Sequence, residues 1–300
     1  MLKFNGRAKE IVSQVVQFAG RWVPVLGGAA LLVGCKGRPF ELDGRRYEAE
    51  SVNRSDWLFE LQPDLKALNQ PLRDRLRDHW LEAARAEHGS IAAFSTLSLQ
   101  LIAVGAPPSL IERTHRAALD EIKHARLCYS LASTYGDEEF GPDRLPEARL
   151  GGSGTIGSRA EELYTLALDS LLNGALNEGM AAREAKMAAS RVKEGVLQKV
   201  WETIARDEHT HGELGWSIVE WCVEQSESEL LPQLLRRLND LERVYTENEK
   251  NLEVNELERS CGLLTLKEQQ ELFELVREEL LGRLILLEQS LPQVLSPLVS

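Results

Sequence analysis

A short pattern of two acidic residues followed by a histidine occurs twice in the chain. The two copies are Asp120-Glu121-Ile122-Lys123-His124 and Asp207-Glu208-His209-Thr210-His211. In each copy the glutamate and the last histidine stand three residues apart, so on an α-helix they project from one face, about one turn from each other. Such a Glu-x-x-His pair is used to hold a metal inside a helical bundle. One copy would prove little in a chain rich in glutamate, but the repeat favours a metal site.

Each copy follows a helical stretch that carries a glutamate on its apolar face. Glu87 shares a stripe with Ala84 and Ile91, and Glu178 shares one with Ala175. A buried carboxylate is costly unless a metal ion or another cation meets it. For either glutamate alone, partial exposure or a buried ion pair would explain the pattern. Their matching positions before the two motifs predict a dinuclear site of four carboxylates and two histidines. Mixed oxygen and nitrogen ligands suit two iron ions, with manganese as the alternative.

Apolar periodicity and helix-end signals predict an all-α fold whose core, residues 71–225, is a four-helix bundle. Pro71 lies in the first turn of the first helix, and capping boxes that begin at Ser109 and Ser158 open the second and third. The fourth helix is predicted to span roughly residues 192–222. The bundle would therefore consist of two helical hairpins. Each hairpin supplies one glutamate from its first helix and Glu-x-x-His from its second.

The segments around the bundle carry no chemical motif. Residues 36–70 are predicted to be an extended segment or a hairpin packed on the bundle. Residues 136–157 form a glycine- and proline-rich loop that serves as a crossover or a lid. Residues 226–300 are predicted to be a C-terminal helical extension with two amphipathic helices, the second opened by a capping box at Thr265. We expect this extension to act as a scaffold or as the interface of a homo-oligomer.

The acidic balance of the chain limits its partners. There are 35 lysines and arginines against 47 aspartates and glutamates, which gives a formal net charge of −12 at pH 7. A strongly negative surface is repelled by a phosphate backbone, which argues against nucleic acid as a partner. Cys128, Cys222 and Cys261 show no CxxC or Cys/His spacing, so they give no evidence for a disulfide framework or a zinc site. Cys128 and Cys222 fall in helical patterns and are predicted to be buried thiols.

Residues 1–35 are predicted to be a secretory signal peptide with a lipobox. A basic leader precedes the apolar run 23–34, which is too short to span a bilayer. The run ends in Leu32-Val33-Gly34-Cys35, which resembles the lipobox of bacterial lipoproteins, where the cysteine is lipidated and becomes the mature N-terminus. The protein would then lie in the cell envelope, anchored to a membrane on the periplasmic side. The alternative is a short helix with Cys35 as a buried thiol, which would leave the protein in the cytoplasm.

Between about residues 78 and 225 the sequence resembles the ferritin-like superfamily of dinuclear iron carboxylate proteins. Glu178, followed after 28 residues by Asp207-Glu208-x-x-His211, is similar in spacing to ribonucleotide reductase small subunits and bacterial multicomponent monooxygenases. Bacterial ferritin-like domain proteins are similar in two further stretches, Glu87-His88-Gly89-Ser90 and Ala118 to Arg126.

The resemblance implies a set of metal ligands and two supporting residues. The ligands would be Glu87, Glu121, His124, Glu178, Glu208 and His211, with the two motif glutamates bridging the ions. Asp120 is expected to accept a hydrogen bond from His211, and Asp207 from His124, because a ligand imidazole needs its other N–H fixed. These families often carry an arginine just before the final histidine. Thr210 stands there in this chain, so that contact is expected to differ.

The resemblance implies functions of two classes. The first is an oxidase or oxygenase, in which the metal site activates dioxygen or peroxide and a small-molecule substrate is oxidised. The second is iron oxidation or peroxide protection, with ferrous ion as the substrate and no organic product. A third, non-catalytic interpretation is a metal-stabilised surface lipoprotein. The long loop at 136–157 favours the first, whereas a location far from cytosolic reductants favours the second.

Overall fold

The computed structural model describes residues 37–42, 45–145, 158–226, 230–241 and 253–290. Within these ranges the protein is all-α apart from four two-residue strands, so the predicted fold class is confirmed. The predicted signal peptide and Cys35 lie outside the described residues, so both stay predictions. None of the described helices is long and apolar enough to cross a membrane.

The first helix pair consists of α2 (Gln70–Ala103) and α3 (Pro108–Gly136), which pack against each other along much of their length. The side chain of Asn69 caps α2 by accepting a hydrogen bond from the backbone N–H of Leu72 at 3.0 Å. The turn after α2 contains Gly105 at φ +72°, a left-handed conformation that favours glycine. A short turn of this kind makes the two helices antiparallel neighbours.

The prediction that Ser109 caps the second helix is wrong. α3 begins two residues earlier than a cap at Ser109 implies, at Pro108, with Pro107 in the capping position and no side-chain hydrogen bond to the helix. Proline in the first turn has a φ that already suits a helix and lacks an N–H that would need a partner, so the helix starts without a polar cap. At the other end, Asp137 closes α3 in the left-handed conformation, with φ 56° and ψ 37°.

The second helix pair opens with a composite helix. α4 (Arg159–Asp169) continues into a π-helical segment, η1 (Ser170–Leu176), and then into α5 (Asn177–Arg191). The capping box at Ser158 is confirmed, because its hydroxyl accepts from the third helical N–H and the glutamate at that position bonds back to the Ser158 N–H. The partner helix is α6 (Gly195–Gln225), which packs along α5 and η1.

Two details of this pair differ from the prediction. The apolar spacing indicated one regular α-helix, but η1 is π-helical and packs so closely on α6 that a Cβ on Gly215 would lie 2.8 Å from the Cα of Gly174. Single π-helical turns often occur at functional sites, and Glu178 lies two residues after this one. The fourth helix also starts later than predicted, because Val192 ends α5 in an extended conformation and the Glu194 side chain caps α6.

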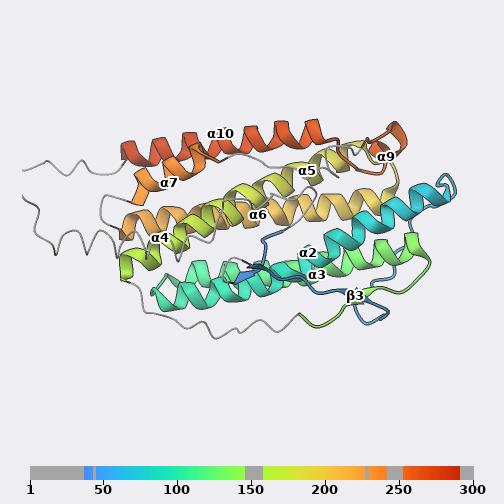
Figure 1. Cartoon of the computed structure of the whole chain (residues 1–300), viewed down its shortest axis with the longest axis horizontal. Helices are drawn as coiled ribbons and strands as arrows, with labels where there is room; N and C mark the ends of the chain where they lie inside the picture. The colour runs from blue at the N-terminus through green and yellow to red at the C-terminus, as the bar shows by residue number, and fades with distance from the viewer. Residues whose placement is uncertain (1–36, 43–44, 146–157, 227–229, 242–252, 291–300) are drawn as a thin grey trace, which may run out of the picture.

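The C-terminal helices cover one side of the bundle. α7 (Leu230–Asn239) packs on α4 and α10 (Leu266–Ser290) packs on α5 and η1, while the short α9 (Glu256–Ser260) lies against α5 (Figure 1). The capping box before α10 is confirmed: the N–H of Thr265 donates to the Glu268 carboxylate at 2.8 Å. A homo-oligomer interface on this extension stays a prediction.

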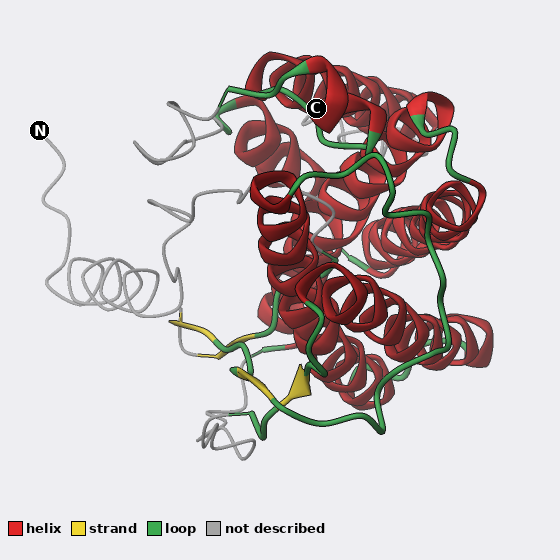
Figure 2. Cartoon of the chain, turned by 90° about the vertical axis from the view of Figure 1, so that its right-hand side faces the viewer, coloured by secondary structure: helices red, strands yellow, loops and turns green. Residues whose placement is uncertain are grey.

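The N-terminal segment is a hairpin, one of its two predicted forms, and the strands lie beside the helices (Figure 2). β1 (Glu41–Leu42) pairs antiparallel with β2 (Arg45–Arg46). β3 (Ser51–Val52) pairs with β4 (Gly141–Pro142), which ties this segment to the chain that follows α3. The loop at 136–157 is described only as far as residue 145, so its role as lid or crossover stays open.

The core consists of two apolar clusters separated by a polar layer. One cluster includes Phe94 and Leu171, and the other includes Trp80 and Trp201. Along each of α2, α3 and α6, the polar layer falls between residues of the two clusters, at the positions of the predicted metal ligands. The cysteines among the described residues are buried and free, which confirms the prediction of buried thiols for Cys128 and Cys222.

Candidate metal centre

The polar layer is a single cluster of carboxylates and imidazoles supplied by four helices. α2 contributes Glu87, α3 contributes Glu121 and His124, α5 contributes Glu178, and α6 contributes Glu208 and His211. His211 is 2% exposed and the other five are 0% exposed. Each side chain points inward because it occupies the apolar stripe of its helix. The structure therefore brings all six predicted ligands together.

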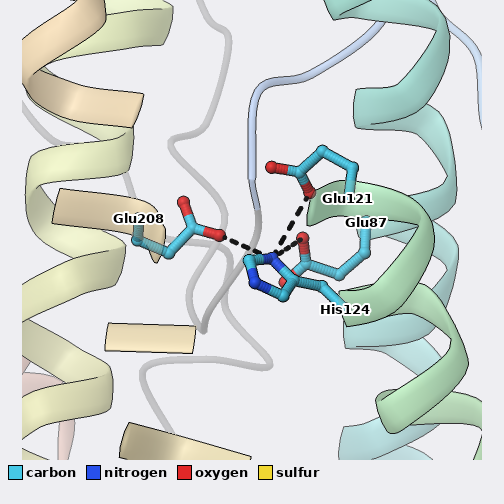
Figure 3. A group of neighbouring side chains, drawn as sticks. All are labelled: Glu87, Glu121, His124 and Glu208. Atoms are coloured by element: carbon cyan, nitrogen blue, oxygen red, sulfur yellow. Dashed lines mark ion pairs between the residues drawn. The ribbon is translucent and has the colours of Figure 1, made fainter. Parts of the chain in front are cut away.

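The six side chains form two overlapping groups, within each of which one donor atom per residue lies within 4.8 Å of all the others. The first group is Glu87, Glu121, His124 and Glu208, and the second is Glu121, Glu178, Glu208 and His211. Glu121 and Glu208 belong to both groups, and we call them the shared carboxylates. Figure 3 shows the first group, with Glu208 reaching His124 from the opposite helix pair. Each group thus has one glutamate and one histidine of its own.

Both histidines turn Nδ1 toward the carboxylates and Nε2 toward an aspartate. Nδ1 of His124 lies 3.1 Å from the nearer shared carboxylate, and its Nε2 lies 3.2 Å from Oδ2 of Asp207. His211 is arranged in the same way. Its Nδ1 lies 3.0 Å from Oε1 of Glu121, and its Nε2 lies 3.4 Å from Oδ2 of Asp120. Asp207 is also held by Nζ of Lys123 at 3.0 Å. Both expected Asp–His contacts are present, and each leaves Nδ1 as the atom that faces the cluster.

The donor atoms of the cluster fit a metal better than they fit one another. All carboxylate oxygens of the four glutamates and both Nδ1 atoms are buried without a hydrogen-bond partner among the described residues. The close nitrogen–oxygen approaches lack hydrogen-bond geometry. Leaving a buried polar atom without a partner costs about 1–3 kcal/mol. Buried oxygen and nitrogen atoms gathered this closely could be satisfied together by a metal ion.

Burial and mutual repulsion favour the protonated form of two of the glutamates. The pKa of Glu87 lies well above its usual value because the side chain is desolvated and faces the carboxylates of Glu121 and Glu208. The pKa of Glu178 is raised well above its usual value by burial and by its contact with Glu208. Glu87 belongs only to the first group and Glu178 only to the second, so neither is a shared carboxylate.

The shared carboxylates and the histidines form a complementary set of charges. Burial opposes ionisation of Glu121 and Glu208. The two imidazoles nevertheless lower the pKa of Glu121, and the contact with Glu178 together with the imidazoles lowers the pKa of Glu208. Burial also lowers the pKa of His124 and His211, but the aspartate behind each ring and the carboxylates in front raise it well above its usual value. These shifts favour ionised shared carboxylates beside imidazolium rings in the metal-free cluster.

Sequence reasoning missed the residues that lie beside the cluster on its N-terminal side. Gly37 is so close that an added Cβ would lie 3.0 Å from Oε2 of Glu87. Ser90 is buried and donates a hydrogen bond to the backbone carbonyl of Arg38 at 2.9 Å. The Arg38 side chain is itself buried, although the segment around it was expected to lie on the outside of the bundle. A short glycine- and proline-containing segment has no periodicity that would have indicated this contact.

Comparison of the chain with protein-family models, with curated proteins and with solved structures found no match. A buried, closed cluster of carboxylates and histidines of this composition could hold a metal ion.

Proposed function

We propose that the protein is a dinuclear non-haem iron protein of the ferritin-like type that reacts with dioxygen or peroxide. One observation carries the proposal: the two donor groups share Glu121 and Glu208, and each keeps a glutamate and a histidine of its own. A single ion would need only one group, whereas two groups with common carboxylates suit two bridged ions. The origin of the donors, one glutamate and one Glu-x-x-His from each helical hairpin, matches the carboxylate-bridged sites of such bundles. Manganese is the alternative metal.

The chain's own residues would hold the ions and keep water away from them. Asp120 and Asp207 fix the rings of His211 and His124, so that each Nδ1 points at an ion. The apolar clusters on both sides of the polar layer exclude bulk water, which strengthens every electrostatic contact inside. When bound, the ions would supply electrons and open coordination positions for chemistry with oxygen species.

The proposed reaction has two candidate forms. The first is an oxidase or oxygenase that acts on a small-molecule substrate, and the second is iron oxidation with peroxide consumption. One observation favours the second: Gly37 packs against Glu87 and Ser90 with no room for a methyl group between them. A centre enclosed in this way suits ferrous ion and peroxide better than an organic molecule. Two ferrous ions would give two electrons to one hydrogen peroxide, which takes up two protons and leaves as two waters.

Iron binding and oxidant consumption test the proposal directly. Protein purified under argon is loaded with ferrous ion, its iron is counted, and dioxygen or peroxide is added. We expect about two irons per chain and consumption of one of the oxidants. Glu178→Gln is the matched control, because Glu178 belongs to one group only and its variant should bind about one iron. Wild-type protein that binds one ion or none, or that binds two and consumes neither oxidant, would contradict the proposal.

Excess ferrous ion separates the two forms of the function. Iron oxidation predicts that many ferric ions form per chain as the oxidant disappears. An oxidase or oxygenase predicts that consumption stops after the bound iron is oxidised, unless an organic substrate and a reductant are added. A non-catalytic, metal-stabilised protein would show neither behaviour, although its melting temperature would still rise with iron.

We also propose that Cys35 is acylated and that the mature protein is a lipoprotein of the cell envelope. The support is the basic leader, the short apolar run and the Leu-Val-Gly-Cys sequence that ends it. Intact-mass measurement on the protein from its native host should find residues 1–34 removed and a lipid mass added. Retention of residues 1–34 would overturn this and leave a cytoplasmic protein.

A further inference from the structure

The N-terminal segment Gly37–Phe40, which we call the strap, forms part of the wall of the metal centre. Gly37, Arg38 and Phe40 are buried. A Cβ placed on Gly37 would lie 2.5 Å from Oγ of Ser90, 3.0 Å from Oε2 of Glu87 and 3.3 Å from Oε2 of Glu121. Figure 3 shows the blue N-terminal chain running down between the two helix pairs toward the drawn side chains. The strap backbone therefore packs directly against two of the proposed ligands.

Arg38 anchors the strap between the helix pairs. Its side chain is only 3% exposed, and its guanidinium forms an ion pair with Asp169 at the end of α4. The guanidinium carbon also lies 5.7 Å from the ring centre of Phe94, whose edge packs on His211 with ring centres 5.3 Å apart. The backbone carbonyl of Arg38 accepts a hydrogen bond from the hydroxyl of Ser90 on α2. One residue thus ties the strap to α2 and α4 beside a proposed ligand.

We propose that the strap determines which reactants reach the metal centre and restricts it to small inorganic ones: ferrous ion, dioxygen and hydrogen peroxide. Arg38 is the positioning residue that holds the strap down. Gly37 is the residue whose lack of a side chain lets the strap touch the ligand carboxylates. The inference rests on the dinuclear site proposed above and adds its substrate class. A bulky reactant would have to displace the strap, at the cost of the Arg38 ion pair.

Access of a bulky chelator to the iron gives a readout that does not depend on activity. Full-length protein is loaded with ferrous ion under argon, and the initial rate of iron extraction by ferrozine is measured. Arg38→Ala and Asp169→Asn should each release iron about tenfold faster than wild type, because a charge-assisted contact is lost. Arg38→Lys should restore most of the slow release. Gly37→Ala should also release iron faster, because the added methyl pushes the strap away from Glu87.

Gly195→Ala is the matched control for Gly37→Ala, because nothing lies within 4 Å of a Cβ at that position. Asp169→Asn keeps the packing of Arg38 and so provides a test if Arg38→Ala does not fold. Unchanged melting temperatures of the metal-free variants would separate an effect on access from an effect on folding.

Peroxides of different size test the selectivity. The wild-type protein should consume hydrogen peroxide and leave cumene hydroperoxide, and the Arg38→Ala or Asp169→Asn variant should gain about tenfold in reaction with cumene hydroperoxide. Wild-type protein that binds fewer than two irons would refute the dinuclear proposal and, with it, this inference. Wild-type protein that binds two irons, with strap variants that release iron and select peroxides as wild type does, would refute the strap inference alone.

Discussion

Binding of two divalent ions to the cluster is predicted to release about four protons. We expect Glu87 and Glu178 to be protonated in the metal-free protein, because burial and the neighbouring carboxylates hold their pKa values well above the usual one. We expect the rings of His124 and His211 to be protonated as well, because the carboxylates around them outweigh burial and hold their pKa values well above the usual one. The ligand forms are carboxylate and neutral imidazole. Each of the two groups must therefore lose one proton from its own glutamate and one from its own histidine.

The number of protons released also determines how metal affinity depends on pH. Two protons released per ion mean that affinity for each ion falls about 100-fold when the pH drops by one unit. A group whose folded pKa is raised stabilises the fold below its usual pKa and loses that contribution as pH rises. The shared carboxylates have lowered pKa values. They therefore stabilise the fold above pH 4.5, the usual pKa of glutamate, and this stabilisation is lost as the pH falls. The metal-free protein should therefore be most stable near pH 4.5, because the shared carboxylates lose their contribution below that value and Glu87 and Glu178 lose theirs above it. The two histidines lose their contribution above 6.5, so metal should stabilise the protein most at higher pH.

Titration calorimetry of metal binding in buffers with different ionisation enthalpies measures the protons released. We expect about two per ion for wild type, and about two in total for Glu178→Gln, which keeps only one complete group. Release of less than one proton per ion would show that the carboxylates are already ionised and the imidazoles neutral before metal arrives, which would refute the charge arrangement argued from burial.

Three further predictions concern single residues. In urea unfolding of metal-free protein, Glu178→Gln should change stability by less than about 0.5 kcal/mol, because an amide replaces a neutral acid. Glu208→Ala should cost about 3–5 kcal/mol, because buried imidazolium rings lose an ionised partner, and equal effects of the two would contradict this. Asp207→Asn should weaken iron affinity about 10–100-fold in chelator competition by freeing the ring of His124; unchanged affinity would show that this contact is not needed. Gly215→Ala should lower stability by about 1–3 kcal/mol in thermal melts through its clash with η1, and an unchanged melting temperature would contradict the close packing.

The helices and the cluster could be predicted because both depend on local spacing. An α-helix brings residues three apart onto one face, so Glu121 and His124 had to act together whatever the rest of the fold. Glu87 could be chosen over Glu82 because it interrupts an apolar stripe, and in the structure Glu87 is buried whereas Glu82 is exposed. A carboxylate in the apolar stripe of a helix therefore predicts that another helix supplies a group, or a metal site, that compensates its charge.

The features that the sequence did not predict depend on contacts between distant segments. The apolar spacing through Leu171, Ala175 and Glu178 suits a regular helix, and only the close packing of Gly174 on Gly215 distinguishes the π-helical turn. The strap at Gly37 has no periodicity, and its burial depends on surfaces supplied by α2 and α4.

The strap and the proposed lipid anchor lead to one last prediction, because they are close in sequence. Gly37 lies two positions after Cys35 in the sequence, and two steps of extended chain span at most about 7 Å. Acyl chains on Cys35 would therefore hold the strap side of the metal centre close to the membrane surface. If reactants enter past the strap, a charged chelator should extract iron more slowly from the acylated protein on vesicles than from a soluble Cys35→Ser protein. Iron extraction by ferrozine from both forms, matched in iron content, tests this. Equal rates would mean that the membrane does not cover the strap, or that the ions are reached from another side.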